Sequence, residues 1–380
     1  MDQTTPQITW LDDTGQPQPV DWRSLAGHAA PARVVVADEG LSADAAFRLI
    51  DQGHGLLWRG AYPQARQLLQ ALGRRLDRRQ QRPAKPAATL ADAFVVQRQQ
   101  QADRARLLGR LLLPFDADHG LPLQRAPDVR AAGLQAHGPV AAHYVASLRE
   151  LLGLVGAFEW HRKGVPIPAL GASIHPHHGV FSPVRGEYIG LLAEANLPAA
   201  ATAHGAFDIG TGSGVLAALL ARRGLRVTAT DLSPDALACA ADNLQRLGLA
   251  SRVTLLPADL FPPGQAGLIV CNPPWVPAPP HSGLDAAVYD PDSRMLRGWL
   301  AGLAAHLVPG GEGWLILSDL AEHLGLRPRD QLLGWIAAAG LRVLGRSDTR
   351  PQHRRAMDAA DPLFAARSAE LTSLWRLGAA

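Results

Sequence analysis

The residues best suited to chemistry are Asn272, Pro273, Pro274 and Trp275, which directly follow the apolar run Leu268–Cys271. That run is typical of a buried strand, so Asn272 stands where a strand is expected to end. The Asn272 side-chain carbonyl and the Pro273 backbone carbonyl can accept the two hydrogens of a substrate –NH2 group. The two prolines keep these acceptors in place, and Trp275 offers a flat apolar wall. The segment therefore predicts four catalytic residues that activate an amide or amino nitrogen; the structural alternative is a proline-rich turn.

A second chemical feature is the glycine-rich loop Gly210-Thr211-Gly212-Ser213-Gly214, which follows Asp208 and opens a helix. Glycines allow a tight turn and close approach of the backbone to a ligand. The spacing differs from that of dinucleotide-binding loops, and the lysine of a phosphate-binding loop is missing. Asp231 and Asp259 each come near the end of a following strand, where Asp231 could bind both hydroxyls of a ribose and Asp259 an exocyclic amine. The alternative is that these acids only cap helices.

Together these residues resemble the class I S-adenosylmethionine-dependent methyltransferases, over about Phe181 to Leu344. The resemblance implies S-adenosylmethionine as the cofactor. It also implies that Asp208 and the loop glycines hold the methionine end, Asp231 the ribose, and Asp259 with Leu260 the adenine. The expected cofactor-binding residues are Phe181, Pro183, Asp208, Gly210, Thr211, Gly212, Gly214, Asp231, Leu232, Asp259, Leu260 and Asn272.

The Asn272–Trp275 segment resembles the (N/D)PP(Y/F/W) signature of enzymes that methylate amino groups. These include HemK-type protein glutamine methyltransferases and nucleic-acid adenine-N6 or guanine-N2 methyltransferases. Trp275 departs from the tyrosine that is commonest in the HemK-type form. Upstream, the segment Phe181-Ser182-Pro183-Val184-Arg185-Gly186-Glu187 resembles the proline–arginine–glutamate segment that precedes the fold in HemK-type enzymes. Here the single residue Gly186 stands between the arginine and the glutamate, where those enzymes usually have two residues. The resemblance implies that Phe181, Pro183 and Glu187 border the cofactor and substrate, and that Glu187 and Trp275 contact the substrate.

The elements that position these residues begin near Ala206, where short apolar strands alternate with amphipathic helices. This alternation of strands and helices predicts a doubly wound, Rossmann-like α/β sheet whose ligands bind at the carboxyl ends of the strands. The expected strands are 207–209, 226–229, 253–256, 268–271, 314–318, 341–344 and a final 371–377. The expected helices are 215–223, 234–247, 295–307 and 328–339.

Residues 1–170 have a different pattern and are expected to form a mainly helical substrate-recognition domain, followed by the catalytic domain at 171–380. Apolar periodicity predicts helices that begin near Ser42 and Tyr62, and further helices over 91–113 and 140–155. Arg33–Val36 has the composition of a strand. The helical character resembles the recognition domain of HemK-type enzymes, although it is longer.

The charge is concentrated in the first of these domains. The whole chain has a formal net charge of +3, whereas residues 66–110 hold 11 basic and 3 acidic residues. Such a segment could bind nucleic acid; the alternative is a solvated arginine-rich surface. A net charge of this size gives no general nucleic-acid footprint.

Composition excludes several other classes of protein. With 47% hydrophobic and 19% charged residues, the chain is neither disordered nor a membrane bundle, and no membrane partner is expected. The N-terminal residues lack the pattern of a secretion signal, and two cysteines suit a reduced cytoplasm. His175, His177 and His178 form a cluster, but Pro176 interrupts it and no cysteine or carboxylate has ligand spacing, so no metal is expected.

These observations predict a cytoplasmic enzyme that methylates an amide or amino nitrogen. The first expectation for the substrate is a protein glutamine side chain, because of the Asn272–Trp275 segment and the segment upstream. An RNA or DNA base amine is the alternative, because of the basic 66–110 segment. A small-molecule methyltransferase, or a protein that uses S-adenosylmethionine without methylating, is the third. The sequence predicts no particular oligomeric state.

Overall fold

The structure is a computed structural model that describes residues 6–12, 14–80, 87–183, 186–280, 284–351 and 358–380. Arg82 and Lys85 of the basic segment, and Val184 and Arg185 of the upstream segment, lie outside these ranges. The chain divides into two compact units, one of residues 1–86 and 95–159 and the other of residues 87–94 and 160–380.

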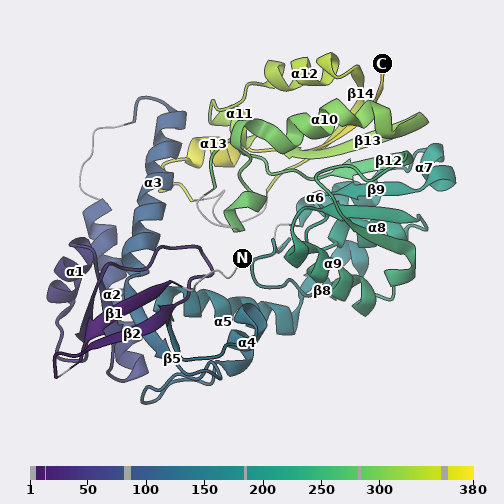
Figure 1. The fold of residues 1–380 in the computed structure, drawn as a ribbon. Coiled ribbons are helices and arrows are strands. Elements are labelled where there is room, and N and C mark those ends of the chain that lie inside the picture. The colour runs from purple at the N-terminus through teal and green to yellow at the C-terminus, as the bar shows by residue number, and fades with distance from the viewer. Residues whose placement is uncertain (1–5, 13, 81–86, 184–185, 281–283, 352–357) are drawn as a thin grey trace. The chain divides into compact units, whose positions relative to one another are not determined.

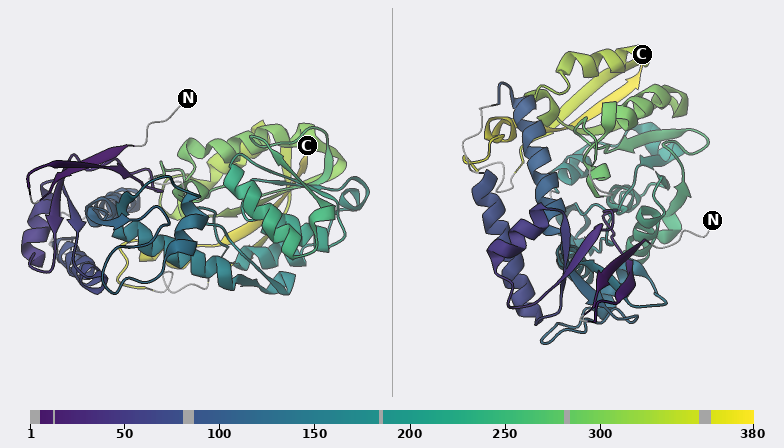
Figure 2. Two further views of the ribbon diagram at one scale, coloured as in Figure 1. Left: turned by 60° about the horizontal axis from the view of Figure 1, so that its bottom comes forward. Right: turned by 60° about the vertical axis from the view of Figure 1, so that its left-hand side comes forward.

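The second unit contains a seven-stranded sheet (Figure 1). Its strands are β9 (Ala206–Ile209), β10 (Val227–Asp231), β11 (Val253–Pro257), β12 (Ala266–Cys271), β13 (Leu307–Ser318), β14 (Leu341–Thr349) and β15 (Thr372–Ala379). They lie in the order β11-β10-β9-β12-β13-β15-β14. Pairing is parallel from β11 to β13, whereas β15 is antiparallel to both of its neighbours. The C-terminal strand, yellow in Figure 2, therefore lies inside the sheet and not at its edge.

Helices cover both faces of this sheet. They are α6 (Glu187–Glu194), α7 (Ala199–His204), α8 (Val215–Arg222), α9 (Pro234–Arg246), α10 (Arg294–His306) and α12 (Arg329–Ala338). Leu268 and Val270 of β12 belong to the core that contains α6 and α8. Ile269 and Cys271, which alternate with them, belong to the core that contains α10 and α12. This alternation places a helical layer on each side, as Figure 1 shows.

The doubly wound α/β fold predicted from the sequence is thus confirmed in the second unit. Each of the seven expected strands and four expected helices is present, with ends that shift by a few residues in most cases. The largest extension is in β13, which begins at Leu307 and not near Trp314. Its added residues include Pro309, Gly310 and Gly311, whose composition is typical of a turn, so apolar patterning gives no sign of them.

The remaining elements of the second unit are short. They are β7 (Val165–Ile167), β8 (Ala172–Ile174), α11 (Leu320–His323), α13 (Phe364–Ala369) and four 3-10 turns at Pro168–Leu170, Ala250–Arg252, Leu284–Ala287 and Pro291–Ser293. Strands β7 and β8 pair with each other, and Val165, Ile167 and Ile174 are buried in the same core as α8. The longer segment of the second unit, Trp160–Ala380, contains this hairpin, whereas the boundary expected from the sequence lies after residue 170.

The first unit combines helices with a six-stranded sheet. The strands are β1 (Gln7–Leu11), β2 (Pro17–Trp22), β3 (Arg33–Ala37), β4 (His54–Trp58), β5 (Leu111–Phe115) and β6 (Tyr144–Ser147), in the order β1-β2-β6-β5-β4-β3. The helices are α1 (Ala43–Asp51), α2 (Tyr62–Gln80), α3 (Leu90–Leu108), α4 (Arg130–His137) and α5 (Leu148–Lys163). The boundaries between the units fall within α3 and α5.

Helical residues outnumber strand residues there, as expected, but the sequence analysis predicted only β3 of the six strands. Two helix predictions had wrong bounds. The helix expected over 91–113 ends at Leu108, and Leu111–Phe115 is a strand. The helix expected over 140–155 begins only at Leu148, after β6, and continues to Lys163. Both strands are short apolar runs buried on both sides, which periodicity alone does not distinguish from a helix.

Within the described ranges, no helix combines the length and the apolar character needed to cross a bilayer.

Candidate active site

Most of the predicted site residues lie at the ends of four neighbouring strands of the seven-stranded sheet, β11, β10, β9 and β12. Strand β9 lies between β10 and β12, and the order of strands along the chain reverses there. Ligands of open α/β sheets bind outside the carboxyl ends of the strands at such a reversal. Ile209 pairs with Cys271 on one side and with Thr230 on the other. Ile209 precedes the glycine loop, Cys271 precedes Asn272, and Thr230 precedes Asp231. These three segments therefore begin at the same level of the sheet.

The glycine loop after β9 needs its glycines for conformation and for space. Gly210, Gly212 and Gly214 all have positive φ, at 72°, 54° and 82°. A Cβ on Gly210 would lie 2.6 Å from the Met295 methyl carbon, and one on Gly214 would lie 3.1 Å from the Ala240 backbone. Only glycine adopts this conformation without strain. The tight turn brings the start of α8 against the end of β9.

Asp208, the penultimate residue of β9, is a buried acid with one unsatisfied oxygen. Its Oδ2 accepts hydrogen bonds from the Thr211 hydroxyl at 2.7 Å and from the Ala217 backbone N–H at 3.0 Å. Its Oδ1 is buried and has no hydrogen-bond partner among the described residues. Burial raises the pKa of Asp208 to about 6. Because an unpaired buried oxygen is costly, this atom is suited to a cationic ligand such as an ammonium group.

Asp231, at the end of β10, has both oxygens held by backbone donors. Gly212 donates to Oδ2 and Ser233 donates to Oδ1, each at 2.9 Å. These bonds fix the plane of the carboxylate and connect it to the glycine loop. Each oxygen retains a further lone pair, which is what a bidentate contact to two hydroxyls requires. Leu232, the next residue, is 66% exposed, which is unusual for a leucine and leaves its side chain free for a ligand.

The residues expected to meet the adenine follow β11. Asp259 forms an ion pair with Arg294, whose guanidinium nitrogens lie 3.3 and 3.4 Å from the carboxylate oxygens. Leu260 has φ at +77°, an uncommon backbone conformation for a leucine. Its carbonyl oxygen accepts a hydrogen bond of 2.6 Å from the Thr230 hydroxyl, which holds the turn against β10. The structure therefore places both residues beside Asp231, and Arg294 is a partner that sequence patterns did not reveal.

The Asn272 side chain lies beside two aromatic residues. The Trp275 indole N–H donates a hydrogen bond of 2.8 Å to Asn272 Oδ1. The Asn272 side chain also acts on the Tyr188 hydroxyl, whose pKa it lowers against the larger effect of burial. The Tyr188 and Trp275 rings are T-shaped, with centroids 6.3 Å apart. Burial, together with the nearby Asp208 carboxylate, raises the pKa of Tyr188, so its hydroxyl stays protonated. Pro273 is buried, while Asn272, Pro274 and Trp275 are half-buried.

Tyr188 was not predicted as a site residue, although it directly follows Glu187 in the upstream segment. Glu187 and Tyr188 are the first residues of α6, so this segment does reach the Asn272 region. Phe181 is half-buried and Pro183 is buried, ahead of that helix. The roles expected for Phe181, Pro183 and Glu187 remain predictions.

Asp290 is a second residue that the sequence analysis missed. It is 6% exposed, and its carboxylate accepts from the Met295 and Leu296 backbone N–H groups at the start of α10. The Asp290 backbone N–H donates to the Val276 carbonyl, so the carboxylate lies near the Asn272–Trp275 segment. Burial, Asp208 and Asp290 together raise the pKa of the Cys271 thiol, which excludes this cysteine as a nucleophile. The available sequence signal for Asp290 was an acid just before a predicted helix.

The basic segment of the first unit is partly neutralised by acids. Arg75 pairs with Asp44, and Arg79 pairs with Asp51. Arg104 pairs with Asp77, and Arg106 with Asp103. The side chains of Asp44, Phe47, Arg75, Arg78 and Arg79 line a surface pocket. The segment thus offers a smaller cationic surface than its composition indicates.

Comparison with known families agrees with the geometry of the second unit. Residues 171–326 match the family model "Methyltransferase small domain". The release factor glutamine methyltransferase of Moorella thermoacetica is 44% identical over 149 residues, which are 33% of this chain and 53% of that protein. The ribosomal RNA small subunit methyltransferase C of Alcanivorax borkumensis is 32% identical over 111 residues, which are 29% of this chain and 30% of that protein.

Among solved structures, a methyltransferase from Pyrococcus furiosus aligns with a TM-score of 0.40 and 17% identity, over 60% of this chain and 98% of that chain. The matched part of the chain spans about half the length of the release factor glutamine methyltransferases to which it is similar. It covers 53% of the Moorella thermoacetica protein and 53% of the Cereibacter sphaeroides protein.

Proposed function

We propose that this chain, whose residues 171–326 form a class I S-adenosylmethionine-dependent methyltransferase domain, methylates the side-chain amide nitrogen of a protein glutamine. The observation that carries this proposal is the Asn272 side chain, held by a hydrogen bond from Trp275 at the reversal point of the sheet. Together with the Pro273 carbonyl, this side chain offers two acceptors, which suit an –NH2 group with two hydrogens better than a hydroxyl with one.

S-adenosylmethionine is the cofactor of this domain, and when bound it supplies an electrophilic methyl group on a cationic sulfur. The residues present fit such a molecule. The unpaired Oδ1 of Asp208 is suited to the ammonium group of the methionine portion, and the two fixed oxygens of Asp231 are suited to the ribose hydroxyls. Asp259, Leu260 and the exposed Leu232 would border the adenine. The carboxylates of this edge favour a ligand that carries positive charge.

Asn272 and Pro273 act on the substrate. An amide nitrogen is a weak nucleophile because its lone pair is delocalised into the carbonyl. Asn272 Oδ1 has two lone pairs, of which the Trp275 indole uses one, so the other can accept a substrate N–H. The Pro273 carbonyl accepts the second N–H. These two bonds draw the nitrogen toward tetrahedral geometry and direct its lone pair at the methyl carbon, and positioning of this kind lowers the barrier to displacement.

The bonds and charges of the transfer balance without a strong base. The new N–CH3 bond forms as the S–CH3 bond breaks, which cancels the positive charge on sulfur and places it on nitrogen. The methylated nitrogen is then acidic and releases one proton to water. Asn272 therefore needs to be an acceptor and not a base, in agreement with its amide side chain.

The choice of a glutamine amide is supported by the relatives that are named release factor glutamine methyltransferases. A base amine of RNA is the second candidate, because another relative is named a ribosomal RNA methyltransferase and the first unit has an arginine-lined pocket.

One labelling experiment distinguishes these substrates. The full-length protein is incubated with cofactor carrying a radioactive methyl group and with a cell lysate, which is then divided and digested with nuclease or protease. We expect macromolecular label that survives nuclease and is lost to protease. Label lost only to nuclease would favour the RNA candidate, and label in neither fraction would indicate a small molecule or no transfer.

The matched control is the Asn272→Ala variant, which should label nothing while its affinity for the cofactor stays within about fivefold of the wild type. A peptide pair then tests the amide itself, with glutamine in one and alanine at the same position in the other. Transfer to both peptides, or full activity of Asn272→Ala, would disprove the proposed role of the amide.

A further inference from the structure

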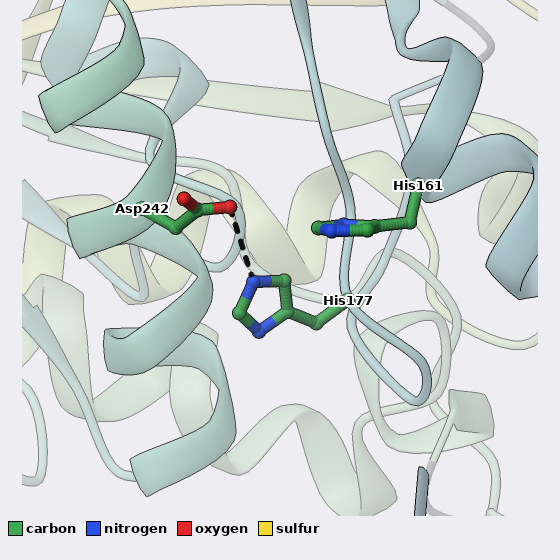
Figure 3. Close-up of side chains that lie close together, drawn as sticks. All are labelled: His161, His177 and Asp242. Carbon is green, nitrogen blue, oxygen red and sulfur yellow. Dashed lines mark hydrogen bonds and ion pairs between the residues drawn. The ribbon is translucent and has the colours of Figure 1, made fainter. Parts of the chain in front are cut away.

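We propose that His161, His177 and Asp242 form a binding site for one divalent transition-metal ion of the zinc class. Their ligand atoms lie within 4.8 Å of one another. Figure 3 shows that they come from three separate parts of the second unit and that both imidazole rings lie toward the same space. His161 is near the end of α5, His177 is in the loop after β8, and Asp242 is on α9. The proposal is independent of the methyl-transfer function.

The distance between two of the ligands already suits a metal. His177 Nε2 and Asp242 Oδ2 are 3.4 Å apart. Zinc binds nitrogen and oxygen at about 2.0–2.2 Å with tetrahedral geometry, so two of its ligands should stand about 3.3–3.5 Å apart. An ion between these two atoms therefore requires little movement. His161 supplies the third ligand, and a water molecule or an external group would complete the tetrahedron.

The surroundings of His161 favour the form that binds metal. Its Nδ1 lies 3.2 Å from the His175 carbonyl oxygen, to which the Nδ1–H donates. That bond leaves Nε2 with a free lone pair, which is the usual arrangement of a metal-binding histidine whose other nitrogen bonds a backbone carbonyl.

Asp242 is prepared in a similar way. Its Oδ1 accepts a hydrogen bond of 2.9 Å from Arg246, one turn later on α9, and this leaves Oδ2 for an ion. Outer contacts of this kind orient the ligands of metal sites.

The loop that carries His177 is held against α9, the helix of Asp242. The His175 backbone N–H donates to the Asn243 side-chain oxygen at 2.6 Å, and the His177 backbone N–H donates to the Cys239 sulfur at 3.3 Å. The position of the ligands is thus set before any ion binds, which favours affinity. A bound ion would in turn stabilise the loop that leads to Phe181.

The sequence analysis predicted no metal here because it considered neighbouring histidines as the ligand set, and most of these are not the ligands. Of the cluster His175, His177 and His178, only His177 belongs to the set, and His175 serves through its backbone carbonyl. The two other ligands are distant in sequence and meet His177 only in the fold. The competing interpretation of the structure is an ion pair between His177 and Asp242, with His161 packed beside it at a ring-centroid distance of 5.1 Å.

A metal titration of the untagged full-length protein tests the proposal. After treatment with a chelator and dialysis, Zn²⁺ is titrated by calorimetry, and Co²⁺ is added separately as a spectroscopic probe. We expect one equivalent of Zn²⁺ per chain, and for Co²⁺ the visible absorption of a tetrahedral site. His177→Ala and Asp242→Asn should each weaken Zn²⁺ binding by more than about 100-fold, because loss of an outer contact alone costs 10–100-fold.

The matched control is His204→Ala, which removes an exposed histidine at the end of α7. It should bind Zn²⁺ as the wild type does, and Zn²⁺ should raise the melting temperature of both proteins but not of His177→Ala. If His177→Ala does not fold, judged by loss of cofactor binding, His161→Gln takes its place in the comparison. No stoichiometric binding to the wild type, or equal affinity in the ligand variants, would overturn the proposal and leave the ion pair.

Discussion

The Trp275 indole N–H donates a hydrogen bond of 2.8 Å to Oδ1 of Asn272, the side chain expected to bind the substrate amide. Both residues belong to one four-residue segment, with two prolines between them. Trp275 therefore has a role beyond an apolar wall, because it determines which way the Asn272 amide faces. Tyr188 acts on the same amide from α6. We expect the orientation of Asn272 to depend on Trp275, in its own segment, and on Tyr188, which is distant in sequence.

Replacing Trp275 by phenylalanine tests this orientation, because it keeps an aromatic ring and removes the N–H donor. A hydrogen bond contributes about 0.5–1.5 kcal/mol, so we expect kcat to fall about tenfold with the affinity for the cofactor unchanged. Single-turnover rates and calorimetry measure the two effects. Trp335→Phe, on the helix α12 of the same unit, is the matched control. A kcat equal to that of the wild type would contradict the proposed role of the indole.

Replacing Tyr188 by phenylalanine tests whether the Tyr188 hydroxyl supports the Asn272 amide. We expect a decrease in kcat of about three- to tenfold, from loss of one hydrogen bond. Because both aromatic residues hold the same amide, the double variant with Trp275→Phe should lose less activity than the product of the single effects. A double-mutant cycle on kcat measures this coupling. Strict additivity would show that the two residues act separately.

Asp231 is expected to hold the ribose, and its replacement should weaken cofactor binding. We expect Asp231→Ala to cost about 1–3 kcal/mol of binding free energy, because hydrogen bonds to a charged group are lost. Asp231→Asn, which keeps one oxygen, should lie between this variant and the wild type. Calorimetry gives the dissociation constants, with Asp235→Ala as a control for an exposed acid nearby on α9. An unchanged dissociation constant in Asp231→Ala would refute the assignment.

The seven strands of the large sheet and four helices of the second unit could be predicted from sequence, whereas five of the six strands of the first unit could not. In the second unit, strands such as Ala206–Ile209 alternate with helices, so the period of the apolar residues changes at each boundary. In the first unit, β5 and β6 lie directly beside helices α3 and α5 in the chain. Their apolar residues continue the helical pattern without a break. The order of strands in that sheet depends on contacts between residues far apart in sequence.

The residues of the candidate site also divide into those that could be predicted from sequence and those that could not. Residues that follow strands, such as Asp231 and Asn272, were found because each strand end is visible in the sequence. Tyr188 and Asp290 were missed because their importance comes from contacts across the fold, to Asn272 and to the start of α10. The ion pair of Arg294 with Asp259 was hidden for the same reason. Spacing reveals chemistry within one segment, and it says little about groups that different segments bring together.

The pKa of Asp208 predicts how cofactor affinity depends on pH. Burial raises this pKa to about 6, from the usual value of 3.8. An ammonium group requires the ionised form, so below pH of about 6 the dissociation constant should increase roughly tenfold for each pH unit. Above about pH 7 it should be constant. Calorimetry at about pH 5, 6 and 7.5 measures this, and binding near pH 6 should release a proton.

The same shift predicts the opposite dependence for stability without cofactor. Because the pKa of Asp208 is higher in the folded protein than its usual 3.8, its contribution to the free energy of unfolding is intact below about pH 4 and is lost as the pH rises through about 6. Asp208→Asn carries no such charge, so its urea midpoint should rise relative to that of the wild type over this interval. The variant should also bind the cofactor weakly at every pH, without the dependence described for the wild type. A wild-type affinity that is flat between about pH 5 and 7.5 would mean that Asp208 does not meet a cationic group.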